Sequence, residues 1–309
     1  MQTLCIGVDI AWWGGGKRKA FQTDHVWAGW VDAAGQISRL EHLPVDLKDS
    51  LGVFPQHPCG LYGKDPYGAA LLDRLSKLSE KAEIWDDVII AIDAPLESAV
   101  RPVARPRRPC YRRGETSGAQ RRSCEHQLGD YLRSLNPIWA KDVNVQPGSP
   151  LFPRISGVVE GLKTIGYRLG ASGRQKSTRS LVEIFPSASI GVLGASESYL
   201  NSDSTKVRRY KTVRHFYSID DAYEIAREPI VGFKGLLGSQ ISQIADQVAI
   251  TAAANLKWKD EHAARSKYFD DVVDAGIAFA TGACLAIGKS FWIGDGSDGA
   301  ILLPKVGDR

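Results

Sequence analysis

Cysteine is scarce in this chain and poorly arranged for cross-links. Five cysteines are spread over 309 residues, an odd number with no C-x-x-C pair, at positions 5, 59, 110, 124 and 284. Disulfide frameworks need paired cysteines, and structural zinc sites need four well-placed ligands. The cysteine pattern therefore argues against both kinds of site.

Long apolar runs are also missing. No uninterrupted apolar stretch approaches the roughly 20 residues needed to span a bilayer. The first residues, Met-Gln-Thr-Leu-Cys, provide no basic lead before an apolar signal-peptide core. With 43% hydrophobic and 24% charged residues, the composition is typical of a globular protein with a sizeable core. We expect a cytoplasmic protein with no membrane partner.

Negative charge is nearly absent from one segment. From Arg101 to Arg122 the chain carries eight arginines and a single acid, although its formal net charge is only +4. We interpret residues 98–153, which are rich in proline and show no long periodicity, as a basic insertion or lid. So dense a cationic patch suits phosphate contacts, and a solvated loop is the alternative. A smaller basic run, Lys17 to Lys19, follows three glycines.

Hydrophobic periodicity predicts an α/β fold. The expected strands lie at 4–9, 25–33, 36–43, 88–93, 181–185 and 300–303. The expected helices lie at 67–81, 155–167, 220–227, 239–256 and 269–287. The first three strands read as an antiparallel meander, and the continuously apolar run at 88–93 is typical of a strand buried on both faces. The last helix is apolar almost all round, which favours a buried position.

Acidic residues accompany the apolar runs and begin the last expected helix. They are Asp9, Asp93, Glu183, Asp270, Asp271 and Asp274. Carboxylates gathered at one sheet edge cannot all stay ionised unless a cation neutralises them, because like charges raise each other's pKa. One or two Mg²⁺ or Mn²⁺ ions, which prefer oxygen ligands, would resolve the repulsion. The alternatives are structural: backbone hydrogen bonds for Asp9 and Asp93, a salt bridge to an arginine for Glu183, and a helix-dipole contact for Asp270.

Five short motifs occur in an order that resembles a known family. They are G-V-D at 7–9, A-I-D-A-P-L at 91–96, V-E-I-F-P at 182–186, D-D-V-V-D-A at 270–275 and G-A-I-L-L-P at 299–304. Together they resemble the predicted RNase H-like nucleases known as domain of unknown function 429, and D-x-x-D-A at 271–275 resembles the motif of RuvC-type resolvases. The resemblance implies a single RNase H-like domain over 1–309, with the basic insertion inside it. It further implies a mixed five-stranded sheet with helices on both faces, acids meeting at the ends of the two central strands, and metal ligands at Asp9, Asp93 and Asp274 with Asp271 or Glu183 completing the set.

The resulting hypothesis is a nuclease or related phosphodiesterase that depends on Mg²⁺ or Mn²⁺ and acts on DNA or RNA. Its catalytic carboxylates would be Asp9, Asp93, Glu183, Asp271 and Asp274. The basic residues expected to hold backbone phosphates are Lys17, Arg101, Arg105, Arg107, Arg108, Arg112 and Arg113, with the rest of the arginine segment as far as Arg122.

Two other functions stay open at this stage. One is a phosphotransferase or nucleotide hydrolase of the same superfamily, and the other is a non-catalytic module that binds nucleic acid with salt-sensitive affinity. Residues 283–290, A-C-L-A-I-G-K-S, match a permissive phosphate-loop pattern. We expect them to end a helix, whereas a working phosphate loop lies between a strand and a helix.

Overall fold

The described residues of the computed structural model are 2–10, 23–46, 68–96, 122–135, 152–170, 177–194, 210, 215–216, 218–259, 262–264, 267–294 and 299–307. Their helices are α1 (Ala69–Ser79), α2 (Ser123–Leu135), α4 (Phe152–Thr164), α5 (Pro186–Gly194), α8 (Ile219–Val231), α9 (Lys234–Leu237), α10 (Ile241–Ala254) and α11 (Lys267–Ala286). Their strands are β1 (Thr3–Asp9), β2 (Thr23–Val31), β3 (Ile37–His42), β4 (Val45–Asp46), β5 (Asp87–Asp93), β6 (Arg168–Leu169), β7 (Arg179–Ile184), β8 (His215–Phe216), β9 (Lys257–Lys259), β10 (His262–Ala264), β11 (Ser290–Ile293) and β12 (Ile301–Pro304).

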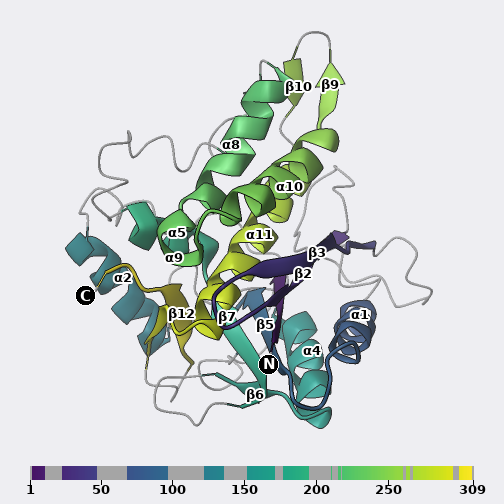
Figure 1. Ribbon diagram of the computed structural model, residues 1–309, viewed down its shortest axis with the longest axis vertical. Helices are drawn as coiled ribbons and strands as arrows, with labels where there is room; N and C mark the ends of the chain where they lie inside the picture. Colours follow the sequence, from purple (N-terminus) through teal and green to yellow (C-terminus); the bar gives the residue numbers. More distant parts are fainter. Residues whose placement is uncertain are drawn as a thin grey trace, which may run out of the picture.

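A mixed sheet lies at the centre of the described structure (Figure 1). Its nine strands follow the path β11-β12-β7-β5-β1-β2-β3, with β4 paired to β2 and β6 paired to β7. Strand β1 is antiparallel to β2 and parallel to β5, and β5 is parallel to β7. The carboxyl ends of β1, β5 and β7 therefore lie at the same edge of the sheet. A smaller sheet, β8-β10-β9, lies at the far end of the α8 and α10 pair.

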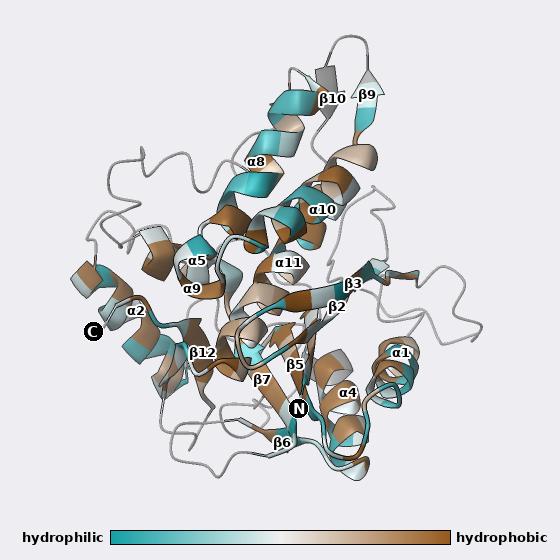
Figure 2. Cartoon of the chain, viewed as in Figure 1, coloured by the Kyte–Doolittle hydropathy of each residue, from teal (hydrophilic) through white to brown (hydrophobic). Residues whose placement is uncertain are grey.

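Helices cover both faces of the main sheet, as the alternating side chains of β1 show. Leu4, Ile6 and Val8 belong to one core with α1 and α4, whereas Cys5 belongs to another core with α8, α10 and α11. This two-sided burial accounts for the nearly continuous apolar sequence of the central strands. Figure 2 shows hydrophobic residues concentrated on these strands and on α4, while α8 is largely hydrophilic.

Helix α11 packs directly on β1 because Gly7 has no side chain. A Cβ atom at Gly7 would lie 2.1 Å from the Phe279 backbone nitrogen and 2.4 Å from the Ala275 carbonyl oxygen. The indole of Trp27 on β2 donates a hydrogen bond of 3.2 Å to the Val272 carbonyl oxygen. These contacts fix the acidic first turns of α11 relative to the end of β1.

The predicted α/β class with a mixed sheet is confirmed, but the sheet among the described residues has nine strands instead of five. The additional strands include β4, β6 and β11, which are only two to four residues long. The expected helices at 67–81, 155–167, 220–227, 239–256 and 269–287 correspond to α1, α4, α8, α10 and α11.

Three described helices were not expected from the sequence: α2, α5 and the four-residue α9. Helix α5 follows β7, and all but its last residue is buried. Helix α2 forms inside the segment at 98–153 that we interpreted as a basic insertion or lid, where no long periodicity had indicated a helix. Its buried Cys124, Leu128 and Leu132 share a core with residues of α5, β11 and β12.

The end of α11 excludes a phosphate loop at 283–290. The helix ends at Ala286, the chain turns at Gly288 with a φ of 73°, and β11 follows. This is a helix-to-strand connection, as expected from the sequence. In the described part of the chain, no helix combines the length and apolar character needed to cross a membrane.

Candidate metal centre

Asp9 and Asp93 lie side by side at the carboxyl ends of β1 and β5. The parallel register pairs them directly. Both residues follow the alternation that directs Cys5, Ile89 and Ala91 into the core beneath α11, so both project toward that helix. Asp9 is buried, with 3% of its surface exposed, and Asp93 is partly exposed.

Asp274, on the helix α11 that packs against β1 and β5, completes a group of three carboxylates. Its neighbour Ala275 touches β1 at Gly7. Asp274 itself is 3% exposed. One carboxylate oxygen from each of Asp9, Asp93 and Asp274 lies within 4.8 Å of the others. Three hard, anionic oxygen donors at this spacing fit a small divalent cation such as Mg²⁺ or Mn²⁺.

Tyr210 contacts this group and was not identified from the sequence. Its hydroxyl donates a hydrogen bond of 2.8 Å to Asp274 Oδ1, and the residue is 1% exposed. Burial raises the pKa of Tyr210 well above its usual value, and the negative charges of Asp274, Asp270 and Asp93 raise it further. The phenol therefore keeps its proton and acts as a donor. No local pattern marks Tyr210, because its partner lies 64 residues away in the chain.

The two other acids of α11 lie outside the group of three. Asp271, one turn before Asp274, is 4% exposed, whereas Asp270 is partly exposed and in the first turn of the helix. Asp270 is close enough to Tyr210 to raise its pKa. Its position also agrees with the helix-dipole alternative considered for this residue.

Glu183 projects from the opposite face of the sheet. In β7, Val182 and Ile184 belong to the core under α11, while Leu181 belongs to the core with α1 and α4. Glu183 shares the alternation of Leu181, so it points away from the three aspartates. The salt-bridge alternative is what the structure shows, because Glu183 binds the guanidinium of Arg122 through both carboxylate oxygens.

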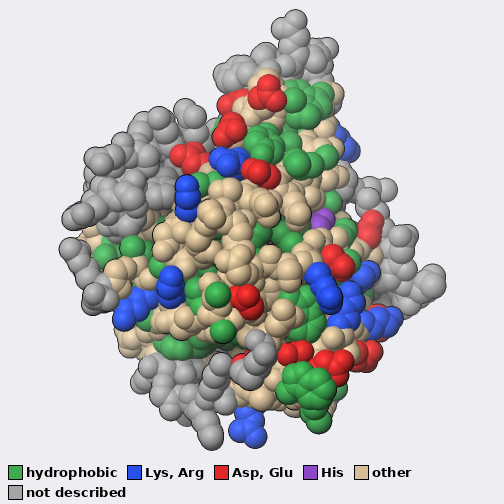
Figure 3. All heavy atoms as spheres, viewed as in Figure 1, with side chains coloured by type: hydrophobic (Ala, Val, Ile, Leu, Met, Phe, Trp, Pro, Cys, Tyr) green, Lys and Arg blue, Asp and Glu red, His purple; other side chains and the backbone are tan. Residues whose placement is uncertain are grey.

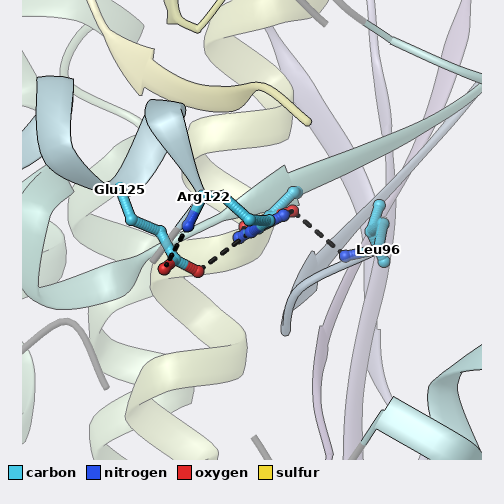
Figure 4. A network of polar contacts seen from close by, with 4 residues as sticks. Leu96, Arg122 and Glu125 are labelled. Atoms are coloured by element: carbon cyan, nitrogen blue, oxygen red, sulfur yellow. Dashed lines mark hydrogen bonds and ion pairs between the residues drawn. The ribbon is translucent and has the colours of Figure 1, made fainter. Parts of the chain in front are cut away.

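A buried ion-pair network surrounds Glu183 (Figure 4). Arg122 Nη1 donates to Glu183 Oε2 over 2.7 Å, and Arg122 Nε donates to Glu125 Oε1 over 2.9 Å. The backbone nitrogen of Leu96 also donates to Glu183 Oε2, over 3.0 Å. Burial raises the pKa of Glu183, and the Arg122 guanidinium opposes that rise. Arg122 is 4% exposed, so its expected contact with phosphates is wrong: its donors serve two internal carboxylates.

His25 is a second neighbour of the aspartates that the sequence analysis left without a role. It lies opposite Asp9 in the antiparallel register of β1 and β2, where facing side chains are about 5 Å apart. Its Nδ1 is 3.2 Å from Nε2 of His42, and its ring meets Tyr268 edge-on. Burial lowers the pKa of His42 to about 4, so that ring is neutral at neutral pH.

The other basic residues expected to bind phosphates, Lys17 and the arginines at 101, 105, 107, 108, 112 and 113, lie outside the described residues. On the face drawn in Figure 3, Lys and Arg side chains beside β3 and α1 are intermixed with acids. The Lys77–Asp73 and Lys81–Glu41 ion pairs, at 2.8 and 3.4 Å, belong to this region. The described basic residues of this region therefore do not form a purely cationic patch.

Comparisons of the chain with protein-family models, with curated proteins and with solved structures found no match.

Proposed function

We propose that this protein is a divalent-metal-dependent hydrolase of phosphodiester bonds, with an RNase H-like arrangement of its sheet and acids. The observation that carries the proposal is the group formed by Asp9, Asp93 and Asp274, whose oxygens lie within 4.8 Å of one another. These residues would hold Mg²⁺ or Mn²⁺. When bound, such a cation polarises a phosphoryl oxygen and neutralises charge that develops on it.

The topology around the acids supports this class of fold. Two of the carboxylates end neighbouring parallel strands, and the third comes from a late helix that crosses the same strands. Helices cover both faces of the sheet, as the resemblance implies. The proposal therefore depends on how the carboxylates are positioned, and not on any single motif.

A nucleic-acid substrate is favoured by the sequence of the arginine-rich segment between Leu96 and Arg122. The chain leaves the described residues after Leu96 and returns at Arg122, and both of these residues bind Glu183. Glu183 thus holds both ends of a segment that contains seven further arginines. A sequence so dense in cations suits a polyanionic substrate such as nucleic acid.

The test is cleavage of labelled single-stranded DNA, duplex DNA, RNA and RNA–DNA hybrid in Mn²⁺ or Mg²⁺. Asp9→Asn and Asp274→Asn keep the side-chain shape and remove a ligand charge. Asp73→Asn is the matched control, because Asp73 is exposed and pairs with Lys77 on α1. We expect wild type and the control to cut at least one substrate, and the two site variants to lose about 100-fold or more of that activity.

Retained cleavage by a folded Asp9→Asn protein would contradict the mechanism. If wild type binds Mn²⁺ at the aspartates and cuts none of the four substrates, nucleic acid is the wrong substrate class while the metal site stands.

A further inference from the structure

Tyr210 is held rigidly against one oxygen of the candidate metal site. Its side chain belongs to the core beneath α11 and is 1% exposed. The hydroxyl lies 2.8 Å from Asp274 Oδ1. A side chain packed on all sides stays in one rotamer, so it can hold a carboxylate in a fixed orientation.

We propose that Tyr210 is a positioning residue that restricts Asp274 to one-oxygen coordination of the cation, and that it thereby makes the site prefer Mg²⁺ and Mn²⁺ to Ca²⁺. The proposal rests on the part of the proposed function that places a divalent cation between Asp9, Asp93 and Asp274. It is independent of which phosphodiester is cut.

The physical basis is competition for Asp274 Oδ1. A cation that chelates a carboxylate through both oxygens needs Oδ1, where it competes with the hydrogen bond that Oδ1 accepts from the Tyr210 hydroxyl. Ca²⁺ takes six to eight ligands at about 2.3–2.6 Å and often binds carboxylates through both oxygens. Mg²⁺ requires near-octahedral geometry with about six ligands at 2.0–2.1 Å and completes it with water. The hydrogen bond therefore lowers the affinity of the site for Ca²⁺ more than its affinity for Mg²⁺.

Tyr210→Phe tests the inference, because it removes the hydroxyl and keeps the ring. Tyr167→Phe is the matched control. Tyr167 is 2% exposed and its hydroxyl contacts Ser79, but it lies in the core on the opposite face of the sheet. Each protein is titrated with Mn²⁺ and with Ca²⁺ by calorimetry, after circular dichroism has shown that it is folded.

We expect Tyr210→Phe to weaken Mn²⁺ binding by about 10-fold or more, the usual effect of removing a partner of a metal ligand. Ca²⁺ binding should weaken less or become tighter, so the preference for Mn²⁺ falls. Tyr167→Phe should leave both affinities unchanged. Unchanged affinities in Tyr210→Phe, or an equal loss for both metals, would overturn the inference.

Failure of the two proposals can be told apart. A wild-type protein that binds no Mn²⁺ removes the metal site, and the role of Tyr210 with it. A wild type that binds Mn²⁺ with the same metal preference as Tyr210→Phe removes only the role of Tyr210.

Wild-type crystals soaked in Mn²⁺ give a second test that does not depend on the stability of a variant. The inference predicts one Asp274 oxygen on the metal and the Tyr210 hydroxyl still on Oδ1. Coordination by both Asp274 oxygens would overturn it.

Discussion

The buried guanidinium of Arg122 allows a quantitative prediction for Arg122→Met. In the folded protein this group binds Glu183 and Glu125, whose side chains are 7% and 4% exposed. Methionine keeps much of the apolar stem and removes every donor. Two buried carboxylates then lose their cation.

The expected cost follows from that geometry. Removing one partner of a buried ion pair usually costs about 3–5 kcal/mol, because the remaining charge stays desolvated. A whole domain is stable by only about 5–15 kcal/mol. Arg122→Met should therefore remove a large part of the free energy of unfolding at neutral pH.

The loss should depend on pH in a defined direction. Burial raises the pKa of Glu183, and without Arg122 only the hydrogen bond from the Leu96 backbone nitrogen opposes the rise. The folded variant then binds a proton more readily than the unfolded chain, whose glutamates titrate near pH 4.3. The destabilisation is greatest above the folded-state pKa of Glu183 and shrinks as the pH falls through it.

Urea denaturation of wild type and Arg122→Met at about pH 8 and about pH 5 measures both effects. Arg133→Met, on the helix α2 that begins directly after Arg122, is the control, because Arg133 pairs with Asp130 and both side chains are more than half exposed. Exposed pairs contribute about 0–1 kcal/mol. A loss below about 1 kcal/mol for Arg122→Met, or a loss that does not change with pH, would refute this account of the network.

Two further predictions concern the packing of α11 and the histidine pair. Gly7→Ala should destabilise the fold by about 1–3 kcal/mol or more, since its Cβ would meet the α11 backbone; Gly235→Ala, which faces open space, should change urea stability by less than about 1 kcal/mol. For His42, the unfolded chain binds a proton near pH 6.5 and the folded protein only near pH 4, so stability should fall by up to about 3 kcal/mol as the pH drops through that range. His42→Gln should flatten this fall in denaturation curves, and an identical fall would contradict the assignment.

The sequence was most informative for the central strands and the long helices. Strong apolar runs ending in Asp9 and Asp93, and the buried helix that carries Asp274, were visible without a structure. Helix α2 also had a signal, because Cys124, Leu128 and Leu132 repeat every four residues. The surrounding prolines and arginines obscured it.

The side of the sheet that Glu183 faces could not be predicted. Its strand is apolar on both faces, so alternation alone cannot say which face lies under α11. Composition likewise could not distinguish Arg122 from the other arginines of its segment. Arg122 is buried because it pairs with Glu183, which lies 61 residues away in the chain. Tyr210 and His25 depend on long-range packing and strand register, which no local pattern contains.

The most direct test of the central claim is calorimetric titration of the wild-type protein with Mn²⁺, beside Asp9→Asn, Asp93→Asn, Asp274→Asn and the exposed control Asp73→Asn. The claim is that three carboxylates from β1, β5 and α11 form one cation site. The account predicts binding by wild type and by Asp73→Asn, and binding weakened about 100-fold or more in each of the three site variants. Equal Mn²⁺ affinity in the wild type and the three folded site variants would contradict it.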